Sequence, residues 1–557
     1  MKITGSQAVI ESLLKEKVEV IFGYPGGANM PIYDALYDYK NRIRHVLVRH
    51  EQGAVHAAEG YARVTGKAGV CLVTSGPGAT NLITGIADAM LDSVPLVCIT
   101  GQVAAHLIGT DAFQETDVIG ITAPITKWNF QITDVGEIPE IFAKAFYISQ
   151  NGRPGPVVID IAKDAQLKTF NFSYPKNYQV KKLLPPMPSE KYIKQASEII
   201  NYAKRPYLIV GHGALISKAS QVIVKFIEKS GIPVASTLHG LGAISTQHDN
   251  YVGMVGMHGH YAPNKLTNQA DVLIAVGMRF DDRVTSTIAT YAPKAKVIHI
   301  DIDASEINKN IKSYVGIIGD AKYVLTKMLP FIKKNRHQVW LNQFKKLNQF
   351  AQKIVDSQPK KIGITMDEVI SMISDKTKGE GIIVADVGQN QMFSARFYQY
   401  KNPNSYITSG GLGTMGFALP ASMGVKIAAP NKQVIAIIGD GGFQMTIQEL
   451  GTIFQEKLSI KILILNNESL GMVRQWQEMF FKKRYSFTHL QNPDFIAISK
   501  GYGIPAKLVI KKDQLEKAVT EFLEQKGPNL LEVRIEKENN IFPMILPGAS
   551  VDKVIIE

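Results

Sequence analysis

Short apolar runs alternate with amphipathic, helix-like segments along most of the chain, and most runs end in glycine or a polar residue. Such runs are typical of strands buried on both faces of a parallel sheet, with the segments between them forming the covering helices. The runs lie at 18–27, 45–51, 69–78, 95–101 and 156–162, then at 205–213, 232–237, 270–280 and 295–303, and finally at 381–390, 433–442, 460–467 and 529–536. The pattern predicts an α/β protein with three doubly wound parallel-sheet domains.

The breaks between these three blocks suggest the domain boundaries. A Pro- and Lys-rich stretch with Pro175, Pro185, Pro186 and Pro188 indicates a linker after the first block. A less apolar helical segment over 336–360 leads into the third block. We expect domains at 1–170, 190–335 and 360–540, followed by a C-terminal tail at 541–557.

The first and third blocks share a faint internal similarity. A Thr-Ser-Gly turn at 74–76 and another at 408–410 are each followed by a helix-like segment and an apolar run. The repeated pattern favours two related domains on either side of the middle one.

Composition excludes several classes of protein. The chain has 557 residues, of which 45% are hydrophobic and 20% charged, as in globular proteins with large cores. No apolar stretch approaches about 18 residues, so we expect no membrane-spanning helix, and the first residues do not resemble a signal peptide. The net charge of +13 comes from 49 scattered lysines and only 13 arginines, which argues against a nucleic-acid partner.

The two cysteines lie within strand-like runs. Cys71 and Cys98 cannot build a disulfide framework, and we expect both to be reduced core residues. This favours a reducing compartment, either the cytoplasm or the plastid stroma of an organelle-encoded protein.

The strongest chemical signal lies in the third block. Gly439-Asp440-Gly441 ends one apolar run, 24 residues intervene, and Asn466-Asn467 ends the next run. Apolar positions at helical spacing lie between them, at Ile447, Leu450, Ile453, Phe454 and Leu458. A strand, helix and strand would bring Asp440 and Asn467 together at one sheet edge, where their oxygens suit Mg²⁺ and the glycines admit a diphosphate. This spacing resembles the thiamine-diphosphate motif.

Glu51 is the second chemical signal. It follows the apolar run 45–50 and opens a helix-like segment over 51–66. An isolated glutamate there would only offset the helix dipole. Beside a thiamine motif it suits a second task, because thiamine chemistry needs a carboxyl group to hydrogen-bond the pyrimidine N1′ nitrogen.

Other cofactor signatures fit poorly. Gly411, Gly413 and Gly416 match a dinucleotide fingerprint, but no acidic residue follows at the required distance. The segment 60–67 has the wrong spacing for a P-loop, and the sequence contains no HExxH or CxxC motif for zinc.

Nine stretches over most of the chain resemble the acetohydroxyacid synthase (acetolactate synthase) family, in its biosynthetic, flavin-containing large-subunit form. They are FGYPGGA (22–28), HEQGAVHAAEGYAR (50–63), TSGPGATN (74–81), GTDAFQETD (109–117), GRPGPV (152–157), GMRFDDRV (277–284), GGLGTMGFALP (410–420), GDGGFQMTIQEL (439–450) and LNNESLGMVRQWQ (465–477).

The resemblance implies roles for individual residues. It makes Glu51 the cofactor-activating acid and places Gly27, Phe113 and Gln114 at the reacting centre. The implied Mg²⁺ ligands are Asp440, Asn467 and the Ser469 carbonyl. The implied thiamine-diphosphate contacts are Gly388, Gln389, Asn390, Gly413, Met415 and Gly441. The implied FAD contacts are Arg153, His258, Gly277, Arg279, Asp301 and Asp320, and the implied substrate residues are Lys163, Met472 and Trp476.

The resemblance also implies an activity and partners. The enzyme would be a decarboxylating carboligase that joins pyruvate to a second pyruvate, giving 2-acetolactate, or to 2-ketobutyrate, giving 2-aceto-2-hydroxybutyrate. These products lead to valine, leucine and isoleucine. The FAD would have no net redox role, the active site would lie between the subunits of a homodimer or tetramer, and a regulatory small subunit would bind.

Three alternatives stay open. One is a thiamine- and flavin-dependent pyruvate oxidase, against which Trp476 argues. Another is a carboligase or decarboxylase for glyoxylate or oxalyl-CoA, and the third is a non-catalytic scaffold.

The sequence departs from many relatives at Ala104, Ala105 and His106, beside the implied substrate channel, so it does not predict herbicide sensitivity.

Overall fold

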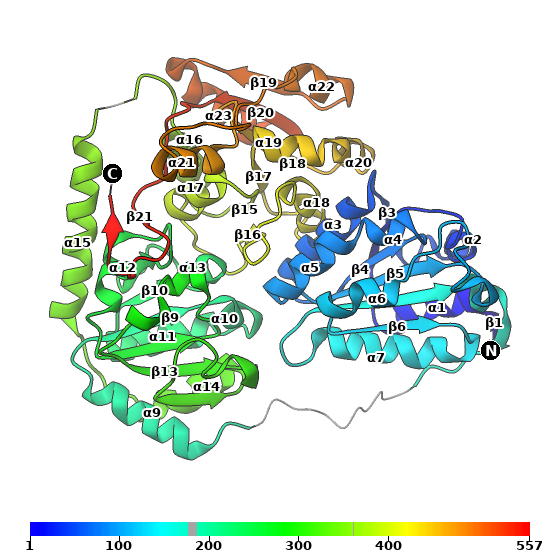
Figure 1. Cartoon of the computed structure of the whole chain (residues 1–557), viewed down its shortest axis with the longest axis horizontal. Coiled ribbons are helices and arrows are strands. Elements are labelled where there is room, and N and C mark those ends of the chain that lie inside the picture. Colours follow the sequence, from blue (N-terminus) through cyan, green and yellow to red (C-terminus); the bar gives the residue numbers. More distant parts are fainter. Residues whose placement is uncertain (176–186, 360, 557) are drawn as a thin grey trace.

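A computed structural model describes residues 1–175, 187–359 and 361–556. It contains three six-stranded sheets in which all the strands are parallel. The domains form a triangle, with the first in blue and cyan, the second in green and the third in yellow and orange (Figure 1). The predicted α/β fold with three parallel-sheet domains is confirmed. Most of the predicted linker, 176–186, lies outside the described residues.

The first sheet is covered by helices on both faces. Its strands, in spatial order, are β3 (Arg44–Leu47), β2 (Val20–Gly23), β4 (Gly69–Val73), β5 (Leu96–Gln102), β7 (Pro156–Ala162) and β6 (Trp128–Ile132). The helices are α1 (Gly5–Lys15), α2 (Met30–Tyr39), α3 (Glu51–Thr65), α4 (Pro77–Thr80), α5 (Ile83–Asp92), α6 (Val118–Thr122), α7 (Ile138–Gln150) and α8 (Lys163–Leu167). A small ribbon joins β1 (Lys2–Thr4) to β8 (Thr169–Asn171).

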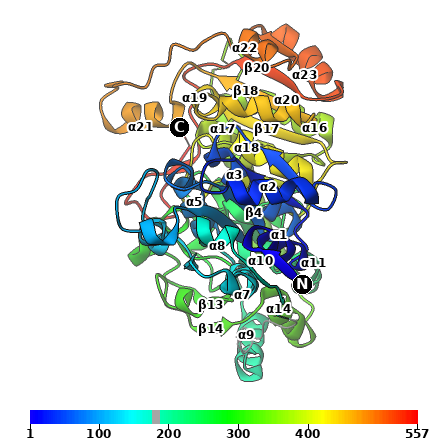
Figure 2. The same cartoon turned by 90° about the vertical axis from the view of Figure 1, so that its right-hand side faces the viewer.

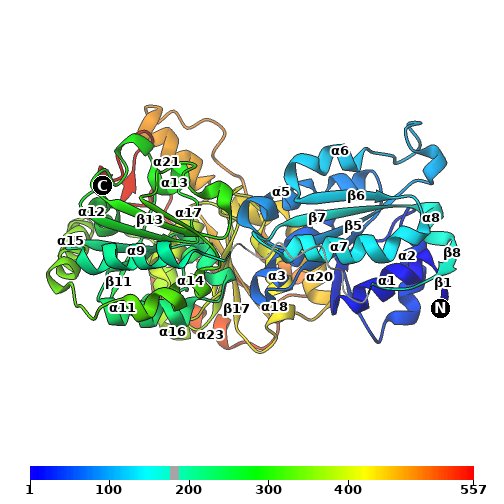
Figure 3. The same ribbon diagram turned by 90° about the horizontal axis from the view of Figure 1, so that it is seen from below.

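The middle domain lies beside the first when the molecule is seen from below (Figure 3). Its strand order is β11 (Tyr251–Met254), β10 (Val234–Ser236), β9 (Pro206–Val210), β12 (Val272–Val276), β13 (Lys296–Asp301) and β14 (Val315–Ile318). Its helices are α9 (Glu190–Tyr202), α10 (His212–Ile216), α11 (Ser220–Ser230), α12 (Tyr261–Thr267), α13 (Asp282–Thr285) and α14 (Ala321–Met328). Helix α15 (Gln338–Ser357), the predicted segment at 336–360, leads to the third domain.

The third sheet repeats the strand order of the first. Its strands are β16 (Tyr406–Thr408), β15 (Ile382–Ala385), β17 (Val434–Gly439), β18 (Ile460–Asn466), β20 (Asn529–Arg534) and β19 (Ala506–Val509). The helices are α16 (Met366–Thr377), α17 (Gln389–Phe397), α18 (Ala418–Ala428), α19 (Asp440–Met445), α20 (Leu450–Gln455), α21 (Gly471–Phe480), α22 (Phe495–Gly501) and α23 (Leu515–Glu524). Helix α21 projects from the body of this domain (Figure 2).

The matching strand orders support the prediction of two related domains. They change, however, which segments of the two domains correspond to each other. Residues 74–76 follow β4, third in its sheet, whereas 408–410 begin at the last residue of β16, first in its sheet. The proposed match between these two turns is therefore wrong. In the observed topology, β4 corresponds to β17, and α3 corresponds to α18. These two helices pack together, and one apolar cluster runs through them from the first sheet to the third.

Two other expectations need adjustment. The single helix expected between Gly439 and Asn466 is divided into α19, a short 3-10 turn at Ile447–Glu449 and α20, with the chain bending at Thr446. The expected tail at 541–557 forms a two-stranded ribbon, β21 (Met544–Ile545) and β22 (Val554–Ile555), and hydrogen-bonds to the middle domain. Within the described residues, no helix has the length and apolar character needed to cross a membrane.

The two cysteines lie where the sequence predicted. Cys71 and Cys98 are buried free cysteines that lie opposite each other on the paired strands β4 and β5.

Candidate active site

Asp440 and Asn467 follow neighbouring strands. Strands β17 and β18 are paired in parallel with Gly439 opposite Leu465, so their carboxyl ends lie side by side. The side chains of both residues are buried. Burial raises the pKa of Asp440 to about 6. The predicted juxtaposition of a carboxylate and an amide at one sheet edge is therefore present.

Asn492 completes this corner and was not identified from the sequence. Its Nδ2 donates to Asp440 Oδ2 at 2.7 Å and to Asn466 Oδ1 at 3.0 Å, so it fixes the two strand ends relative to each other. It lies in the loop before α22, and nothing in the surrounding sequence distinguishes it from an ordinary loop asparagine.

Two hydrogen bonds fix Ser469 beside Asn467. Its N–H donates to Asn467 Oδ1 at 3.2 Å, and its Oγ donates to the Thr488 carbonyl at 2.9 Å. An isolated bridge to His489 fixes the same residue. The Asp440 carboxylate, the Asn467 amide and the Ser469 carbonyl form a hard-oxygen donor set that fits Mg²⁺.

The residues expected at the diphosphate lie next to this corner. Gln389 Oε1 lies 3.4 Å from Asn467 Nδ2, and Gln389 Nε2 donates to Gln475 of α21 at 2.9 Å. Asn390 donates to the Asp386 carbonyl at 2.7 Å. Gly388 has a φ of +139°, which suits glycine, and it directly precedes the N-terminus of α17.

The loop between β16 and α18 brings Met415 into the same region. A Cβ built on Gly441 would lie 3.5 Å from Met415 Cε, so a side chain there would fill the space beside the methionine. Gly413 has a φ of +76° and open space around it. Met415 therefore lies close to Gly441 at the edge where β17 ends, and Gly413 lies two residues before Met415 in the same loop.

Glu51 lies at the equivalent edge of the first sheet. It opens α3, and His50 caps this helix by accepting the Gln52 N–H. Glu51 Oε2 accepts from Asn81 Nδ2 at 2.9 Å, and a Cβ built on Gly78 would lie 3.4 Å from Glu51 Oε1. The turn at 74–81 thus forms one wall around the carboxylate.

Two further predicted residues lie near this turn. A Cβ built on Gly76 would lie 2.8 Å from the Gln114 carbonyl, so Gln114 packs directly on it. Gly27 has open space on its Cβ side, and the neighbouring Ala28 N–H donates to Thr74 Oγ1 at 3.1 Å. Phe113, in contrast, points outward and is 88% exposed.

Glu449 is a second residue that sequence reasoning missed. Its Oε1 accepts the backbone N–H groups of Arg49 and His50, both at 3.0 Å, so the third domain fixes the loop just before Glu51. Burial raises the pKa of Glu449 to about 7. Its neighbours in sequence carry no motif that marks this role.

The proposed substrate residues are spread over two domains. Trp476 and Met472 lie on α21, where the Trp476 ring packs against Phe480 with centroids 5.2 Å apart. Lys163 opens α8 in the first domain, and its N–H reaches the Val103 carbonyl at 3.4 Å. In the part of the chain that the structure describes, no hydrogen bond or ion pair joins Glu51 to Asp440, Asn467 or Ser469.

A cavity of about 360 Å³ lies between the first and middle domains. Five of the six predicted FAD residues line it, namely Arg153, Gly277, Arg279, Asp301 and Asp320. Two guanidinium groups suit a dinucleotide's phosphates, and the carboxylates suit its hydroxyl groups. Burial raises the pKa of Asp301, at the end of β13, to about 6.

His258 is not among the residues that line this cavity. It is buried, and its Nδ1 has no hydrogen-bond partner among the residues that the structure describes. Burial, followed by the charges of Arg396 and Arg283, lowers the pKa of His258 to about 3. The cavity therefore brings together five of the six predicted FAD residues, and the contact of His258 with FAD stays a prediction.

Comparisons with known proteins agree with this geometry. Residues 3–121 match the "Thiamine pyrophosphate enzyme, N-terminal TPP binding domain", 193–328 match the "central domain" and 386–533 match the "C-terminal TPP binding domain".

Full-length relatives are also similar. The chain is 45% identical to the acetolactate synthase large subunit of Corynebacterium glutamicum, over 99% of this chain and 89% of the relative. It is 44% identical to the isozyme 2 large subunit of Escherichia coli, over 99% of both chains. It is also 44% identical to a probable acetolactate synthase large subunit of Methanocaldococcus jannaschii, over 99% of this chain and 95% of the relative. The chain therefore belongs to the acetolactate synthase large-subunit family of thiamine diphosphate enzymes.

Proposed function

We propose that this chain is a decarboxylating carboligase that joins pyruvate to a second 2-ketoacid. The observation that carries the proposal is the corner where Asp440 and Asn467 follow the paired strands β17 and β18. With pyruvate as acceptor the product is 2-acetolactate, and with 2-ketobutyrate it is 2-aceto-2-hydroxybutyrate. The names of the relatives support this assignment over a pyruvate oxidase.

The third domain would bind the diphosphate end of thiamine diphosphate. Asp440, Asn467 and the Ser469 carbonyl would hold Mg²⁺, while Gly388, Gln389 and the N–H groups at the start of α17 would receive the phosphate charge. When bound, thiamine diphosphate supplies an electron sink for decarboxylation and carbon–carbon bond formation.

Glu51 would hold a proton at the pyrimidine end. Asn81 already occupies Oε2, whereas Oε1 accepts no hydrogen bond from any described residue and is available for a ring nitrogen. The contacts of Glu449 with the Arg49 and His50 amides fix the loop that presents Glu51. Glu51 can therefore exchange a proton with the pyrimidine without moving its backbone.

The complete site would form between two chains. Among the described residues of one chain, Glu51 makes no hydrogen bond or ion pair with Asp440, Asn467 or Ser469. Phe113 and Phe487 are 88% and 98% exposed, which leaves large apolar side chains available to a second copy. A homodimer, alone or within a tetramer, would pair Glu51 of one chain with Asp440 of the other. Because the relatives are named large subunits, we also propose a regulatory small-subunit partner.

The cavity between the first and middle domains would bind FAD. Arg153 would contact phosphate from a position fixed by its hydrogen bonds to Ser93 at 2.8 Å and Glu306 at 2.9 Å. Asp301 and Asp320 would accept hydrogen bonds from hydroxyl groups. In a carboligase this flavin has no net redox role.

One assay tests the activity directly. The purified chain is incubated with pyruvate, thiamine diphosphate, Mg²⁺ and FAD, with and without 2-ketobutyrate, while acetolactate and oxygen uptake are both measured. We expect acetolactate without stoichiometric oxygen uptake, and a second product when 2-ketobutyrate is added. Oxygen consumption equal to pyruvate consumption, without acetolactate, would establish an oxidase instead.

A further inference from the structure

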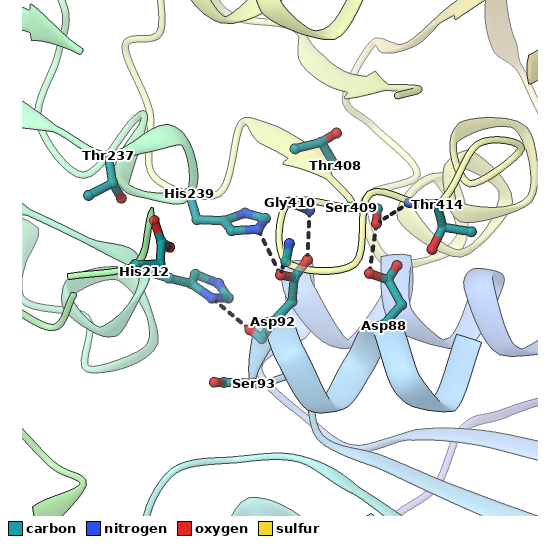
Figure 4. A network of polar contacts seen from close by, with 12 residues as sticks. Asp88, Asp92, Ser93, His212, Thr237, His239, Thr408, Ser409, Gly410 and Thr414 are labelled. Atoms are coloured by element: carbon teal, nitrogen blue, oxygen red, sulfur yellow. Dashed lines mark hydrogen bonds and ion pairs between the residues drawn. The ribbon is translucent and has the colours of Figure 1, made fainter. Parts of the chain in front are cut away.

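Asp92 ends α5 at a point where all three domains meet (Figure 4). Its Oδ1 accepts the Gly411 N–H at 2.7 Å and lies 3.0 Å from His239 Nε2. Its Oδ2 accepts the Gly410 N–H at 3.0 Å and pairs with Arg63 Nη2 at 2.6 Å. One buried carboxylate thus contacts the third domain, the middle domain and the helix that carries Glu51.

The Asp92 carboxylate is charged in this setting. Burial alone would raise the pKa of Asp92, but His239 and Arg63 outweigh it and hold that pKa well below its usual range. Oδ1 accepts from Gly411, and Oδ2 accepts from Gly410 and Arg63, so a carboxamide could accept on only one side, and its NH₂ group would face a donor on the other. The arrangement therefore requires aspartate rather than its isostere asparagine.

On one side, Asp92 fixes the loop that carries Met415. This loop, 409–417, joins β16 to α18, and its first turn is anchored by the contacts of Asp92 with Gly410 and Gly411. Ser409 Oγ donates to Asp88 at 2.7 Å and accepts the Thr414 N–H at 2.8 Å, directly before Met415. The acidic side chains of Asp88 and Asp92 on α5 therefore fix the backbone from which Met415 extends.

On the other side, Asp92 lines the cavity between the first and middle domains, together with His212 and His239. His212 Nδ1 lies 2.9 Å from the Asp92 carbonyl. A Cβ built on Gly410 would lie only 2.2 Å from His239 Nε2, so this ring packs directly on the loop backbone. A ligand that moves or immobilises His239 must also act on Gly410 or Asp92.

We propose that Asp92 is a positioning residue that couples occupancy of this cavity to the geometry of loop 409–417. Binding of the flavin dinucleotide and binding of thiamine diphosphate then strengthen each other, although the two ligands use different domains. The inference rests on the proposed function for the identity of both ligands. It also gives a physical task to a flavin that takes no part in the net redox chemistry.

The test measures thiamine-diphosphate affinity by calorimetry in excess Mg²⁺, with the full chain either free of FAD or saturated with it. In the unmodified protein we expect FAD to lower the dissociation constant of thiamine diphosphate at least about fivefold. Thiamine diphosphate should lower the dissociation constant of FAD by the same factor. We call the dissociation constant of thiamine diphosphate without FAD, divided by that with FAD, the coupling ratio. In Asp92→Asn, both ligands still bind, but the coupling ratio falls to about one. A purely structural role would weaken both affinities and leave the ratio intact.

Ser93→Ala is the matched control. Ser93 lines the same cavity and accepts a hydrogen bond from Arg153, but no described contact joins it to loop 409–417. The coupling ratio of Ser93→Ala should therefore match that of the unmodified protein, even if FAD binds more weakly. Should Asp92→Asn not fold, His239→Gln tests the same contact from the cavity side and should also reduce the ratio.

Two results would overturn the inference. The first is no coupling in the unmodified protein, and the second is undiminished coupling in a folded Asp92→Asn or His239→Gln chain. Failure of the unmodified protein to bind thiamine diphosphate would instead overturn the proposed function.

Discussion

Gly60 and Gly424 occupy reciprocal positions where α3 crosses α18. A Cβ on Gly60 would lie 2.1 Å from the Ala421 carbonyl oxygen, and a Cβ on Gly424 would lie 1.8 Å from the Ala57 carbonyl oxygen. Because α3 and α18 are equivalent helices of the two related domains, each helix supplies a glycine that the backbone of the other requires. This close crossing places Glu51, at the start of α3, relative to the third domain.

Replacing either glycine with alanine should destabilise the protein. Alanine is the better helix former, by about 1 kcal/mol, but its Cβ would overlap a backbone oxygen that cannot move alone. We expect Gly60→Ala and Gly424→Ala each to lower the free energy of unfolding by about 1–3 kcal/mol. Denaturant titration measures this change.

Gly501→Ala is the control for this prediction. Gly501 ends α22 with an exposed position and open space on its Cβ side, so the same substitution should be neutral or slightly stabilising. Equal stability of all three variants would show that the helix crossing is not as close as described.

Asp88 gives a prediction for pH dependence. Burial, followed by the charges of Glu59 and Asp92, raises the pKa of Asp88 to about 8. The folded protein therefore keeps a proton that the unfolded chain releases above about pH 4. Its contribution to stability is fully present below that pH and is lost as pH rises toward 8, by at most about 1.4 kcal/mol per pH unit.

Asp88→Asn mimics the protonated acid and should flatten this dependence. Its oxygen can still accept from Ser409, so the fold persists, and the thermal midpoint should fall less between pH 5.5 and 8 than in the unmodified protein. Asp38→Asn, at an exposed position of α2, removes the same charge and should leave the slope unchanged. Parallel profiles for Asp88→Asn and the unmodified protein would contradict the assignment of a buried proton.

The sequence predicted the central strands of every sheet but few of the edges. Runs such as 433–442 and 460–467 are continuous and apolar because those strands are buried on both faces. Five edge strands gave no recognised signal, namely β6, β11, β14, β16 and β19. They are short or only partly buried, as in β6 and β19, so their residues do not form a marked apolar run.

The candidate site was predictable where its residues end strands or open helices. Asp440, Asn467 and Glu51 do so, and their types and spacing limit the chemistry. Asn492 and Glu449 could not be predicted, because their roles depend on tertiary contacts with segments remote in sequence. The Thr-Ser-Gly similarity misled for a related reason, since three matching residues do not determine a strand's place in its sheet.

Glu51→Gln tests the proposed proton transfer. The amide keeps the size of the side chain but cannot share a proton with a ring nitrogen in the same way, so we expect acetolactate formation to fall about 100-fold or more. Thiamine diphosphate should still bind, because the residues around Asp440 are unchanged. Glu140→Gln, an exposed acid in the first turn of α7, should retain full activity. Substantial carboligation by Glu51→Gln would remove this residue from the mechanism.

Trp476→Leu tests the acceptor preference. We expect the Trp476 ring on α21 to contact the extra methylene of 2-ketobutyrate. Its loss should lower the ratio of 2-aceto-2-hydroxybutyrate to 2-acetolactate about tenfold. Competition assays with both 2-ketoacids measure the ratio directly. Val473→Ala, at an exposed position of the same helix, should leave the ratio unchanged. An unchanged ratio in Trp476→Leu would place the acceptor pocket elsewhere.

Calorimetric titration of thiamine diphosphate into the full-length protein tests the central claim most directly, because the account depends on the Asp440 and Asn467 corner. We predict binding that requires Mg²⁺ and that weakens about tenfold or more in Asp440→Asn, but not in Asp513→Asn, which changes an exposed aspartate of the same domain. Equal affinity in Asp440→Asn, or no binding by the unmodified protein in saturating Mg²⁺, would contradict the account.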